Sequence, residues 1–319
     1  MTTALASCMR NEGIFVLEWL AYHHGMFDRV IVVTNDCTDG SDALLDVAQE
    51  MGLCTHIRQT VPKGGSPQDL GMDHVLRLCR AEGITHVLHI DSDEFLFLPE
   101  GDVTDLLNRT HDADVIPIPW LPMGDTGVTD WTPGDLVVER NIRAAPGLEP
   151  GETKFKCLFK VASFARATDH NPLEPLVDDP QVRSPDGKKL RNATLYQPKS
   201  ARFRPLGKAC EVTTAFLFHY AVKSEDVFLM KNDRGDGQGK DSTKYHLGSH
   251  WHRQANRNDV DEHSLLLQAP RLRVRLEEWR RSPALAEAEQ ACHAWFMDRR
   301  TQILTPENRA LWTRGKATA

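Results

Sequence analysis

The chain has 319 residues, 40% of them hydrophobic, and a formal net charge of −7. These values predict a soluble globular protein and argue against wholesale nucleic-acid binding, because proteins that bind the phosphate backbone usually carry a basic face. Seven well-separated cysteines indicate free thiols rather than a disulfide framework or a zinc site. No apolar run approaches the roughly 20 residues that span a bilayer, and the first residues lack a signal pattern. We therefore expect a cytoplasmic protein, with peripheral contact at the inner face of the membrane left open.

The first half of the chain alternates strand-like and helix-like segments, which is typical of a parallel sheet covered by helices. Short apolar or β-branched runs predict strands at residues 5–9, 29–34, 54–58 and 86–90. Helices are expected over residues 11–22, 41–51 and 68–82, with Asn11 as the cap of the first. Ligands of such sheets bind beyond the carboxyl ends of the strands, so the loops starting at Asn35 and Asp91 should open on one edge.

The second half is less regular. We expect strands at residues 114–120, 135–139, 156–161 and 214–220, a helix from 224 to 231, and a mostly helical tail. The segment from Lys188 to Lys208 holds seven basic residues and no acid, which fits a solvated loop, an anionic acceptor site or contact with anionic lipid. The predicted organisation is one domain over residues 1–262, with a nucleotide-binding half (1–100) and an acceptor half (101–262), followed by a helical extension (263–319).

The segment HVLHIDSDEFLFL, residues 86–98, places three carboxylates in an apolar run. At the end of a buried strand, Asp91, Asp93 and Glu94 carry a desolvation cost that ion pairing or metal coordination must offset. Magnesium and manganese prefer oxygen ligands and keep positions open for phosphate. In extended backbone Asp91 and Asp93 would point to the same face. This pattern predicts a divalent metal that holds a diphosphate.

Three strings in order resemble bacterial family-2-type glycosyltransferases: RNEGIFVLEWLAYHHGMFDRVIVVTNDCTDGSDALLD, HVLHIDSDEFL and HYAVKSEDVFLMKNDRG. More narrowly, they are similar to the group related to the family-92 galactosyltransferases. The resemblance covers about residues 7–261 and is specific for the superfamily, not for the sugar. It implies the GT-A fold, an α/β architecture with a mainly parallel sheet flanked by helices. It also implies a Mn²⁺ or Mg²⁺ cofactor, a nucleotide-diphosphate sugar donor, with UDP expected, and a saccharide or lipid-linked acceptor.

On the nucleotide side, the resemblance implies that Arg10, Asn11 and Glu12 lie beside the nucleotide at the end of the first strand. A simple helix cap is the alternative for these three residues. Asp36 and Asp39 would lie near the base or ribose, although both also fit ordinary turn chemistry.

For the metal, the resemblance makes Asp91 and Asp93 the Asp-x-Asp pair, with Asp93 the stronger candidate for a direct ligand. His219 is the implied third ligand, since neutral imidazole suits manganese, but a histidine at a strand end is also commonly structural. Cations that could close over the diphosphate follow it in the chain: Lys223, Lys231 and Arg234. Such cations stabilise a leaving group, while the alternative is a solvated helix face.

An inverting glycosyltransferase also needs a carboxylate that takes the proton of the acceptor hydroxyl. The segment PWLPMGDTG stands where relatives carry an acceptor loop, which makes Asp125 the leading candidate, ahead of Asp130 and Glu152. Glu94 is either a catalytic or acceptor-binding group or a hydrogen-bond partner that supports the metal site. Trp120 could stack on a sugar or lie in the core.

Two other residues, Lys156 and His170, are expected to pack in the interior. The main prediction is a metal-dependent, inverting glycosyltransferase of polysaccharide biosynthesis. One alternative is a metal-dependent nucleotidyltransferase, which would release pyrophosphate instead of a nucleotide diphosphate. Another is a catalytically silent nucleotide-sugar-binding or scaffold protein, against which the retained acidic residues argue.

Overall fold

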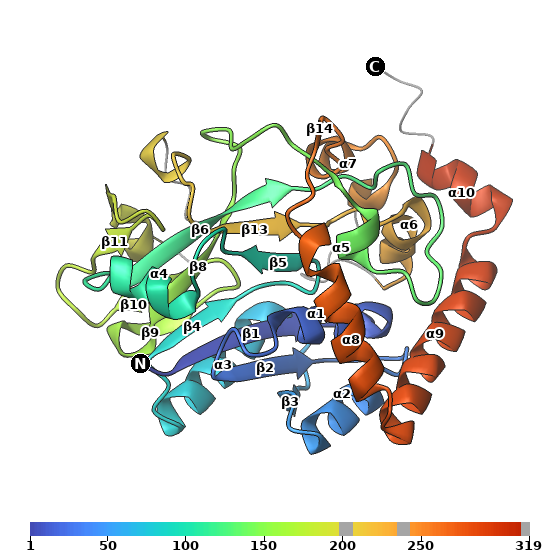
Figure 1. Ribbon diagram of the computed structural model, residues 1–319, viewed down its shortest axis with the longest axis horizontal. Coiled ribbons are helices and arrows are strands. Elements are labelled where there is room, and N and C mark those ends of the chain that lie inside the picture. The colour runs from blue at the N-terminus through green and yellow to red at the C-terminus, as the bar shows by residue number, and fades with distance from the viewer. Residues whose placement is uncertain (198–206, 235–242, 314–319) are drawn as a thin grey trace.

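The computed structural model describes residues 1–197, 207–234 and 243–313. The strands of its large sheet are β1 (Thr3–Met9), β2 (Arg29–Thr34), β3 (Thr55–Arg58), β4 (His86–His89), β5 (Glu94–Phe97), β6 (Val115–Pro122), β8 (Phe155–Lys160), β11 (Val182–Arg183), β12 (Lys189–Leu190) and β13 (Phe216–His219). Their order is β12-β11-β6-β8-β4-β1-β2-β3, and β13 pairs with both β5 and β6 (Figure 1). Two further pairs join β7 (Arg143–Ala144) to β14 (Val260–Asp261) and β9 (Phe164–Ala167) to β10 (Pro172–Pro175).

Helices cover both faces of this sheet. The helices of the described residues are α1 (Gly13–His23), α2 (Ser41–Glu50), α3 (Pro67–Ala81), α4 (Val103–Arg109), α5 (Val137–Arg140), α6 (Glu225–Arg234), α7 (His250–Ala255), α8 (Ala269–Trp279), α9 (Pro283–Ile303) and α10 (Pro306–Thr313). Successive strand residues alternate between two cores, because side chains of a strand point to opposite faces. One core holds Leu5, Val32 and Leu88 with α1 and α2, and the other holds Ala4, Ile31 and Val87 with α3.

The predicted mainly parallel α/β architecture is confirmed. Strand β1 lies between β2 and β4 and runs parallel to both, so the three carboxyl ends meet at one edge of the sheet. Two residues at this edge have backbone angles that side-chain-bearing residues rarely adopt: Asn11 with φ of 53° and Asp36 with φ of 48°. Such strain is commonly found at functional sites. The edge predicted to bind ligand is therefore also a strained one.

Two local expectations were wrong, and one strand was missed. Residues 135–139 are not a strand, because the chain forms the short helix α5, in which Val138 N donates a 3.1 Å hydrogen bond to Oε1 of Glu18. Asn11 does not cap α1, since Glu12 holds the N-cap position, without a side-chain capping bond. The Asn11 side chain instead bonds to Thr38, accepting from its backbone N at 2.8 Å and donating to its hydroxyl at 3.1 Å. Strand β5 was not anticipated.

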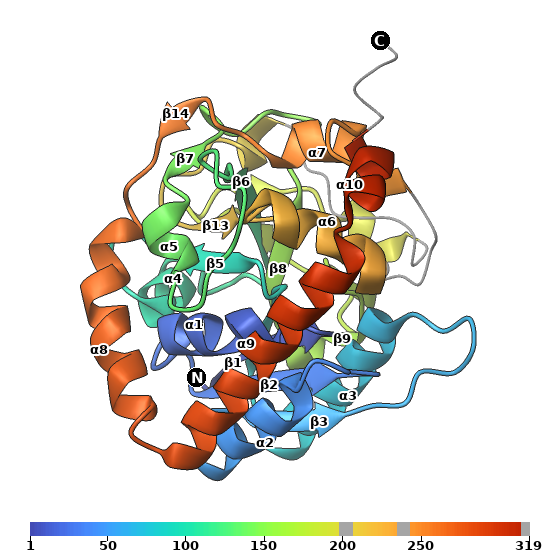
Figure 2. The same ribbon diagram turned by 90° about the vertical axis from the view of Figure 1, so that its right-hand side faces the viewer.

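The predicted helical tail is present as α8, α9 and α10. It folds back on the rest of the chain: α9 packs against α1 and α2 from the first half and against α6 from the second half (Figure 2). The contact is close at Gly13, where a Cβ atom would lie 2.6 Å from Sγ of Cys292. All seven cysteines are free thiols, as predicted. No helix of the described segments has both the length and the apolar character that crossing a membrane requires.

Candidate metal and nucleotide site

The Asp-x-Asp segment forms a turn between β4 and β5. Glu94 N donates a hydrogen bond of 3.0 Å to the carbonyl oxygen of Asp91, which closes this turn. The extended conformation expected from the sequence is therefore wrong, and the carboxylates of Asp91 and Asp93 contact different partners. The chain reverses here because β5 pairs with β13 rather than continuing the line of β4.

Asp91 is paired with a lysine that does not reach solvent. Its Oδ2 lies 3.0 Å from Nζ of Lys156, and its Oδ1 accepts a 3.1 Å hydrogen bond from Nε2 of Gln68. The same ammonium lies 3.8 Å from Oε1 of Glu94 and 4.0 Å from Oδ2 of Asp169. Burial alone would lower the pKa of Lys156, but the three carboxylates raise it above its usual range. Lys156 thus neutralises an acidic cluster instead of simply packing in the core.

Asp93 has two cationic or polar partners. Its Oδ2 lies 3.0 Å from Nζ of Lys231, and its Oδ1 lies 3.5 Å from Nε2 of His219. Burial would raise the pKa of Asp93, but Lys231 and His219 hold it well below the usual range. Burial also lowers the pKa of His219, which favours the neutral imidazole that a metal requires. The ring of Trp120 lies against that of His219, with centroids 4.0 Å apart.

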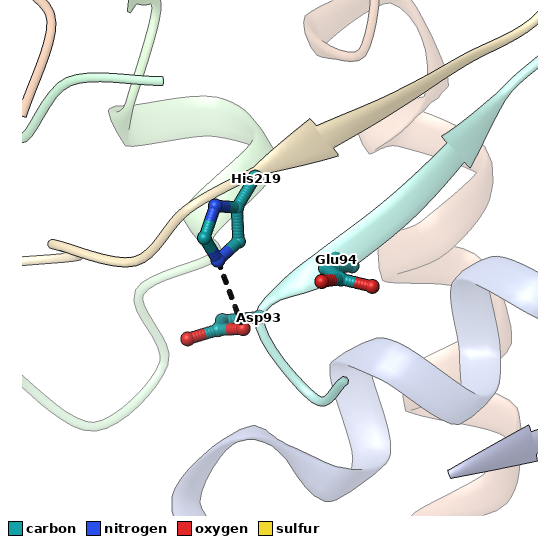
Figure 3. A group of neighbouring side chains, drawn as sticks. All are labelled: Asp93, Glu94 and His219. Carbon is teal, nitrogen blue, oxygen red and sulfur yellow. Dashed lines mark ion pairs between the residues drawn. The ribbon is translucent and has the colours of Figure 1, made fainter. Parts of the chain in front are cut away.

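Three of these side chains could hold a metal ion. Ligand atoms of Asp93, Glu94 and His219 all lie within 4.8 Å of one another (Figure 3). Glu94 is fully buried: its Oε2 accepts a 3.0 Å hydrogen bond from Asp91 N, while Oε1 has no hydrogen-bond partner among the described residues. Burial raises its pKa well above the usual range. Two carboxylates and an imidazole fit a divalent ion such as Mn²⁺ or Mg²⁺, and Oε1 of Glu94 accepts no hydrogen bond from the described residues that such an ion would have to replace. In this group Glu94 stands where the sequence led us to expect Asp91.

The residues predicted beside the nucleotide do not all have the same surroundings. Asn11 and Glu12 line a cavity together with Lys231, Trp295 and Phe296. The last two belong to α9, so the helical tail contributes to this cavity. Arg10 and Asp36 are exposed at the neighbouring strand ends.

Asp39 is buried and bonded within the protein. Its Oδ2 accepts a 2.8 Å hydrogen bond from Gly13 N, and its Oδ1 accepts from Ser41 N at 2.9 Å and from the Ser41 hydroxyl at 2.6 Å. The Asp39 carboxylate therefore accepts hydrogen bonds from the first turns of both α1 and α2, which fits the turn chemistry considered from the sequence.

Lys223 lies close to the same cavity. Its Nζ is 3.6 Å from Oε2 of Glu12 and 3.8 Å from the ring centroid of Phe15, and it makes no hydrogen bond in the described part of the chain. Burial lowers its pKa to about 7. The side chain of Arg234 and much of the basic segment, residues 198–206, lie outside the described residues.

A second cavity is lined in part by His219. Its lining includes Trp120 and Trp251, with Lys154 at 5.5 and 4.2 Å from the two ring centroids. Glu152, which is exposed, also lines this cavity. Aromatic rings beside polar groups are suited to binding a sugar.

Asp125 does not line either of these two cavities. Its carboxylate accepts hydrogen bonds from Gly127 N at 2.9 Å, from Asn256 Nδ2 at 2.8 Å and from Asn258 Nδ2 at 3.1 Å. Asp130 is exposed and lies 3.6 Å from Nη2 of Arg309. Glu152, and not the leading candidate Asp125, thus lines a cavity that His219 also lines.

Gln68, Trp251 and Trp295 are among the contributors to these sites that sequence reasoning missed. Trp251 and Trp295 lie in the irregular second half and in the tail, where no motif indicated a ligand. The role of Lys156 was also missed, although an interior lysine in the apolar string FKCLF was a signal that some buried acid needed a partner.

Comparisons with known proteins found remote structural similarities. No family model matches the chain, and no curated protein does. Staphylococcus aureus TarS 1–349 in complex with UDP is 14% identical, with a TM-score of 0.32 over 51% of this chain and 47% of that one. The mannosyltransferase PcManGT from Pyrobaculum calidifontis, in complex with GDP-Man and Mn²⁺, is 14% identical, with a TM-score of 0.30 over 92% of this chain and 87% of that one.

A third similar structure is the galactosyltransferase LgtC in complex with donor and acceptor sugar analogues, at 17% identity and a TM-score of 0.27 over 50% of this chain and 58% of that one. This chain therefore spans about half the length of the TarS and LgtC structures that it matches. With TM-scores below 0.5, the similarities are too remote to define activity, which must be inferred from the site.

Proposed function

We propose that this protein is a metal-dependent glycosyltransferase of the GT-A type. The donor is a nucleotide-diphosphate sugar, with UDP expected, and the acceptor is a saccharide or a lipid-linked saccharide. The observation that carries the proposal is the meeting of Asp93, Glu94 and His219 at the carboxyl edge of the sheet. Mn²⁺ or Mg²⁺ held by these side chains would supply positive charge for the leaving diphosphate.

The donor would bind along the edge formed by β1, β2 and β4. Asn11 and Glu12 line the cavity at the end of β1, and Lys231 enters the same cavity from α6. In this proposal Lys223 and Lys231 provide charge toward the diphosphate, and Asp91 faces the ribose or a metal-bound water. The strained backbone at Asn11 and Asp36 supports a ligand-binding role for this edge.

The acceptor would occupy the second cavity, which Trp120, Trp251 and His219 line. Glu152 is then the general base. In the inverting step the acceptor hydroxyl oxygen bonds to the anomeric carbon, and the bond from that carbon to the diphosphate oxygen breaks. The electron pair leaves with the nucleotide diphosphate, and the hydroxyl proton passes to the Glu152 carboxylate.

Calorimetry of UDP and GDP binding in the presence of Mn²⁺ tests the donor and metal parts of the proposal. We expect micromolar to millimolar binding that is lost when Mn²⁺ is removed and when Asp93 is replaced in Asp93→Ala. Glu50→Ala removes an exposed carboxylate at the end of α2 and serves as the matched control. Nucleotide binding that is unaffected by both chelation and Asp93→Ala would refute the proposal.

Incubation with nucleotide sugars then identifies the reaction. A glycosyltransferase releases the nucleotide diphosphate, often slowly to water when no acceptor is present. Release of pyrophosphate from a nucleoside triphosphate and a sugar phosphate would indicate a nucleotidyltransferase instead. Binding without turnover of any donor would favour a silent nucleotide-sugar-binding protein.

A further inference from the structure

The Lys231 ammonium pairs with one carboxylate oxygen of Asp93, the residue proposed as a metal ligand. Its Nζ lies 3.0 Å from Oδ2 of Asp93 and donates a 2.8 Å hydrogen bond to the carbonyl oxygen of Ala221. The Lys231 side chain is 8% exposed and that of Asp93 is 12% exposed. This contact is therefore a built-in ion pair at the site and not a surface salt bridge.

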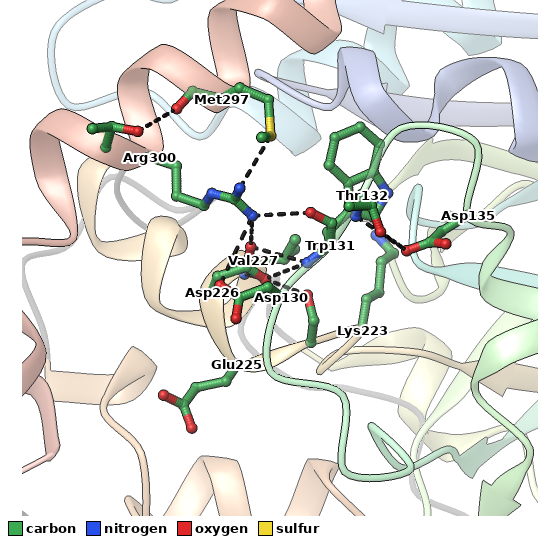
Figure 4. Close-up of polar contacts among 12 residues, drawn as sticks. Asp130, Trp131, Thr132, Asp135, Lys223, Glu225, Asp226, Val227, Met297 and Arg300 are labelled. Atoms are coloured by element: carbon green, nitrogen blue, oxygen red, sulfur yellow. Dashed lines mark hydrogen bonds and ion pairs between the residues drawn. The ribbon is translucent and has the colours of Figure 1, made fainter.

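The helix that carries Lys231 is anchored to α9 near both of its ends. Near its start, Asp226 accepts hydrogen bonds from Arg300 at 2.5 Å and from Trp131 N at 3.1 Å (Figure 4). Near its end, Asp233 accepts from Arg299 at 2.7 and 2.9 Å. Because both ends are held, Lys231 reaches Asp93 from a fixed backbone.

An ammonium and a divalent ion are alternative occupants of Asp93. Both carry positive charge, and their repulsion at a few ångströms is large where water is excluded. Oδ1 of Asp93 faces Nε2 of His219 at 3.5 Å, so an ion shared by Asp93 and His219 would approach the same carboxylate that Lys231 already contacts through Oδ2. Removal of both cations would leave a buried carboxylate uncompensated, which is costly.

We propose that the Lys231 ammonium pairs with the Asp93 carboxylate in the free protein, and that the divalent ion that arrives with the nucleotide diphosphate displaces it from this carboxylate. This inference rests on the proposed function. Because α6 is anchored, its backbone stays in place, and the exchange takes place by rotation of the Lys231 side chain alone. It leaves the ammonium in the cavity beside Asn11 and Glu12, where a diphosphate oxygen can accept its hydrogen bonds.

The exchange predicts that the free protein binds a divalent ion weakly, because the ion must first displace Lys231. The test is titration of the full chain with Mn²⁺ alone, with free Mn²⁺ measured by electron paramagnetic resonance. Lys231→Met removes the competing charge but keeps much of the side-chain volume. It should bind Mn²⁺ at least tenfold more tightly than the wild type.

Lys244→Met is the matched control, because Lys244 lies over the rings of Tyr245 and Trp251 instead of against Asp93. Its Mn²⁺ affinity should equal that of the wild type. Equal affinities of the wild type and a folded Lys231→Met would overturn the exchange while leaving the metal site intact. Absence of Mn²⁺ binding by every variant, even with UDP present, would instead contradict the metal site of the proposed function.

Crystals of the wild type with Mn²⁺ and UDP provide a measurement that does not depend on the folding of a variant. We expect Nζ of Lys231 more than about 4 Å from both Asp93 oxygens, beyond the usual limit of an ion pair, and close to a diphosphate oxygen. An ammonium and an ion bound together on Asp93 would overturn the proposal.

Discussion

Nζ of Lys156 lies 3.0 Å from Oδ2 of Asp91, although the two residues are 65 positions apart in the chain. No part of the lysine side chain reaches solvent, whereas 26% of the Asp91 side chain does. Buried ion pairs contribute little net stability, but removal of one partner leaves a charge without compensation. The acidic turn therefore depends on Lys156 even when no ligand is bound.

Lys156→Met should lower the free energy of unfolding by about 3–5 kcal/mol, because it leaves Asp91 and its acidic neighbours without their cation. Urea denaturation followed by circular dichroism measures this loss. The double variant Asp91→Asn with Lys156→Met should recover part of it, since one of the uncompensated charges is gone. A double variant no more stable than Lys156→Met would show that the pairing with Asp91 is not what makes Lys156 necessary.

Replacement of the proposed base should affect turnover and not donor binding. We expect Glu152→Gln to lower kcat about 100-fold or more, because a general base typically contributes that much. The affinity for UDP with Mn²⁺ should remain within about twofold of wild type, because Glu152 lines the acceptor cavity. Initial rates of UDP release and calorimetry separate the two effects.

Asp125→Asn is the comparison for that experiment. The new amide would face the donor groups of Asn256 and Asn258, so we expect a loss of stability of about 1–3 kcal/mol with kcat largely retained. The reverse result, with Asp125→Asn inactive and Glu152→Gln active, would assign the base to Asp125.

Asp39 should prove more important for stability than for nucleotide binding. Asp39→Ala removes the acceptor of three hydrogen bonds at the starts of α1 and α2, with an expected cost of about 2–4 kcal/mol. Ser41→Ala removes only one of these bonds and should cost about 1 kcal/mol. Thermal unfolding measures both. A stable Asp39→Ala protein that no longer binds UDP would make Asp39 a nucleotide ligand instead.

His23 should make stability depend on pH. Its Nδ1 lies 2.9 Å from the carbonyl oxygen of Trp19, its Nε2 accepts from Leu96 N at 3.2 Å, and burial lowers its pKa to about 3. The unfolded chain binds a proton near pH 6.5, whereas the folded ring stays neutral to about pH 3. The contribution of His23 to stability is therefore full above pH 6.5 and falls by about 1.4 kcal/mol per pH unit below it.

His23→Gln removes this titration, so the stability difference between wild type and variant should shrink by about 2 kcal/mol between pH 6.5 and pH 5. Burial raises the pKa of Glu18 to about 7, so the contribution of Glu18 to stability changes with pH in the opposite direction. Because Glu18 is present in both wild type and His23→Gln, its contribution cancels in the difference between them. Urea denaturation at several pH values gives the difference. A difference that does not change with pH would mean that the buried ring is not held neutral.

Short-range sequence patterns predicted the strands whose ends form the site. The β-branched run RVIVVT and the apolar run before Asp91 became parallel strands, because each is buried on both faces of the sheet. Since parallel strands end at one edge, Asn11, Asp36 and Asp91 could be placed together without knowledge of any contact. This part of the prediction depends only on periodicity and on the direction of the strands.

The partners of the acidic residues could not be predicted in the same way. Lys231 is 138 positions from Asp93, and Lys156 enters from an antiparallel strand whose position no local pattern determines. The reversal after Asp91 also depends on the pairing of β5 with β13, which forms only in the complete sheet. For this reason the sequence indicated the cost of the buried charges correctly but did not identify Lys156 and Lys231 as the cations that offset it.

The contribution of α9 to the cavity beside Asn11 has a consequence for the order of synthesis. Strand β1 leaves the ribosome well before α9, which carries Trp295 and Phe296 and completes that cavity. Because domains tend to fold as synthesis proceeds, the nascent chain can form much of its sheet well before this cavity has all of its walls. Binding of the proposed nucleotide there must therefore await the synthesis of α9, so a translation product interrupted before α9 would lack the finished cavity.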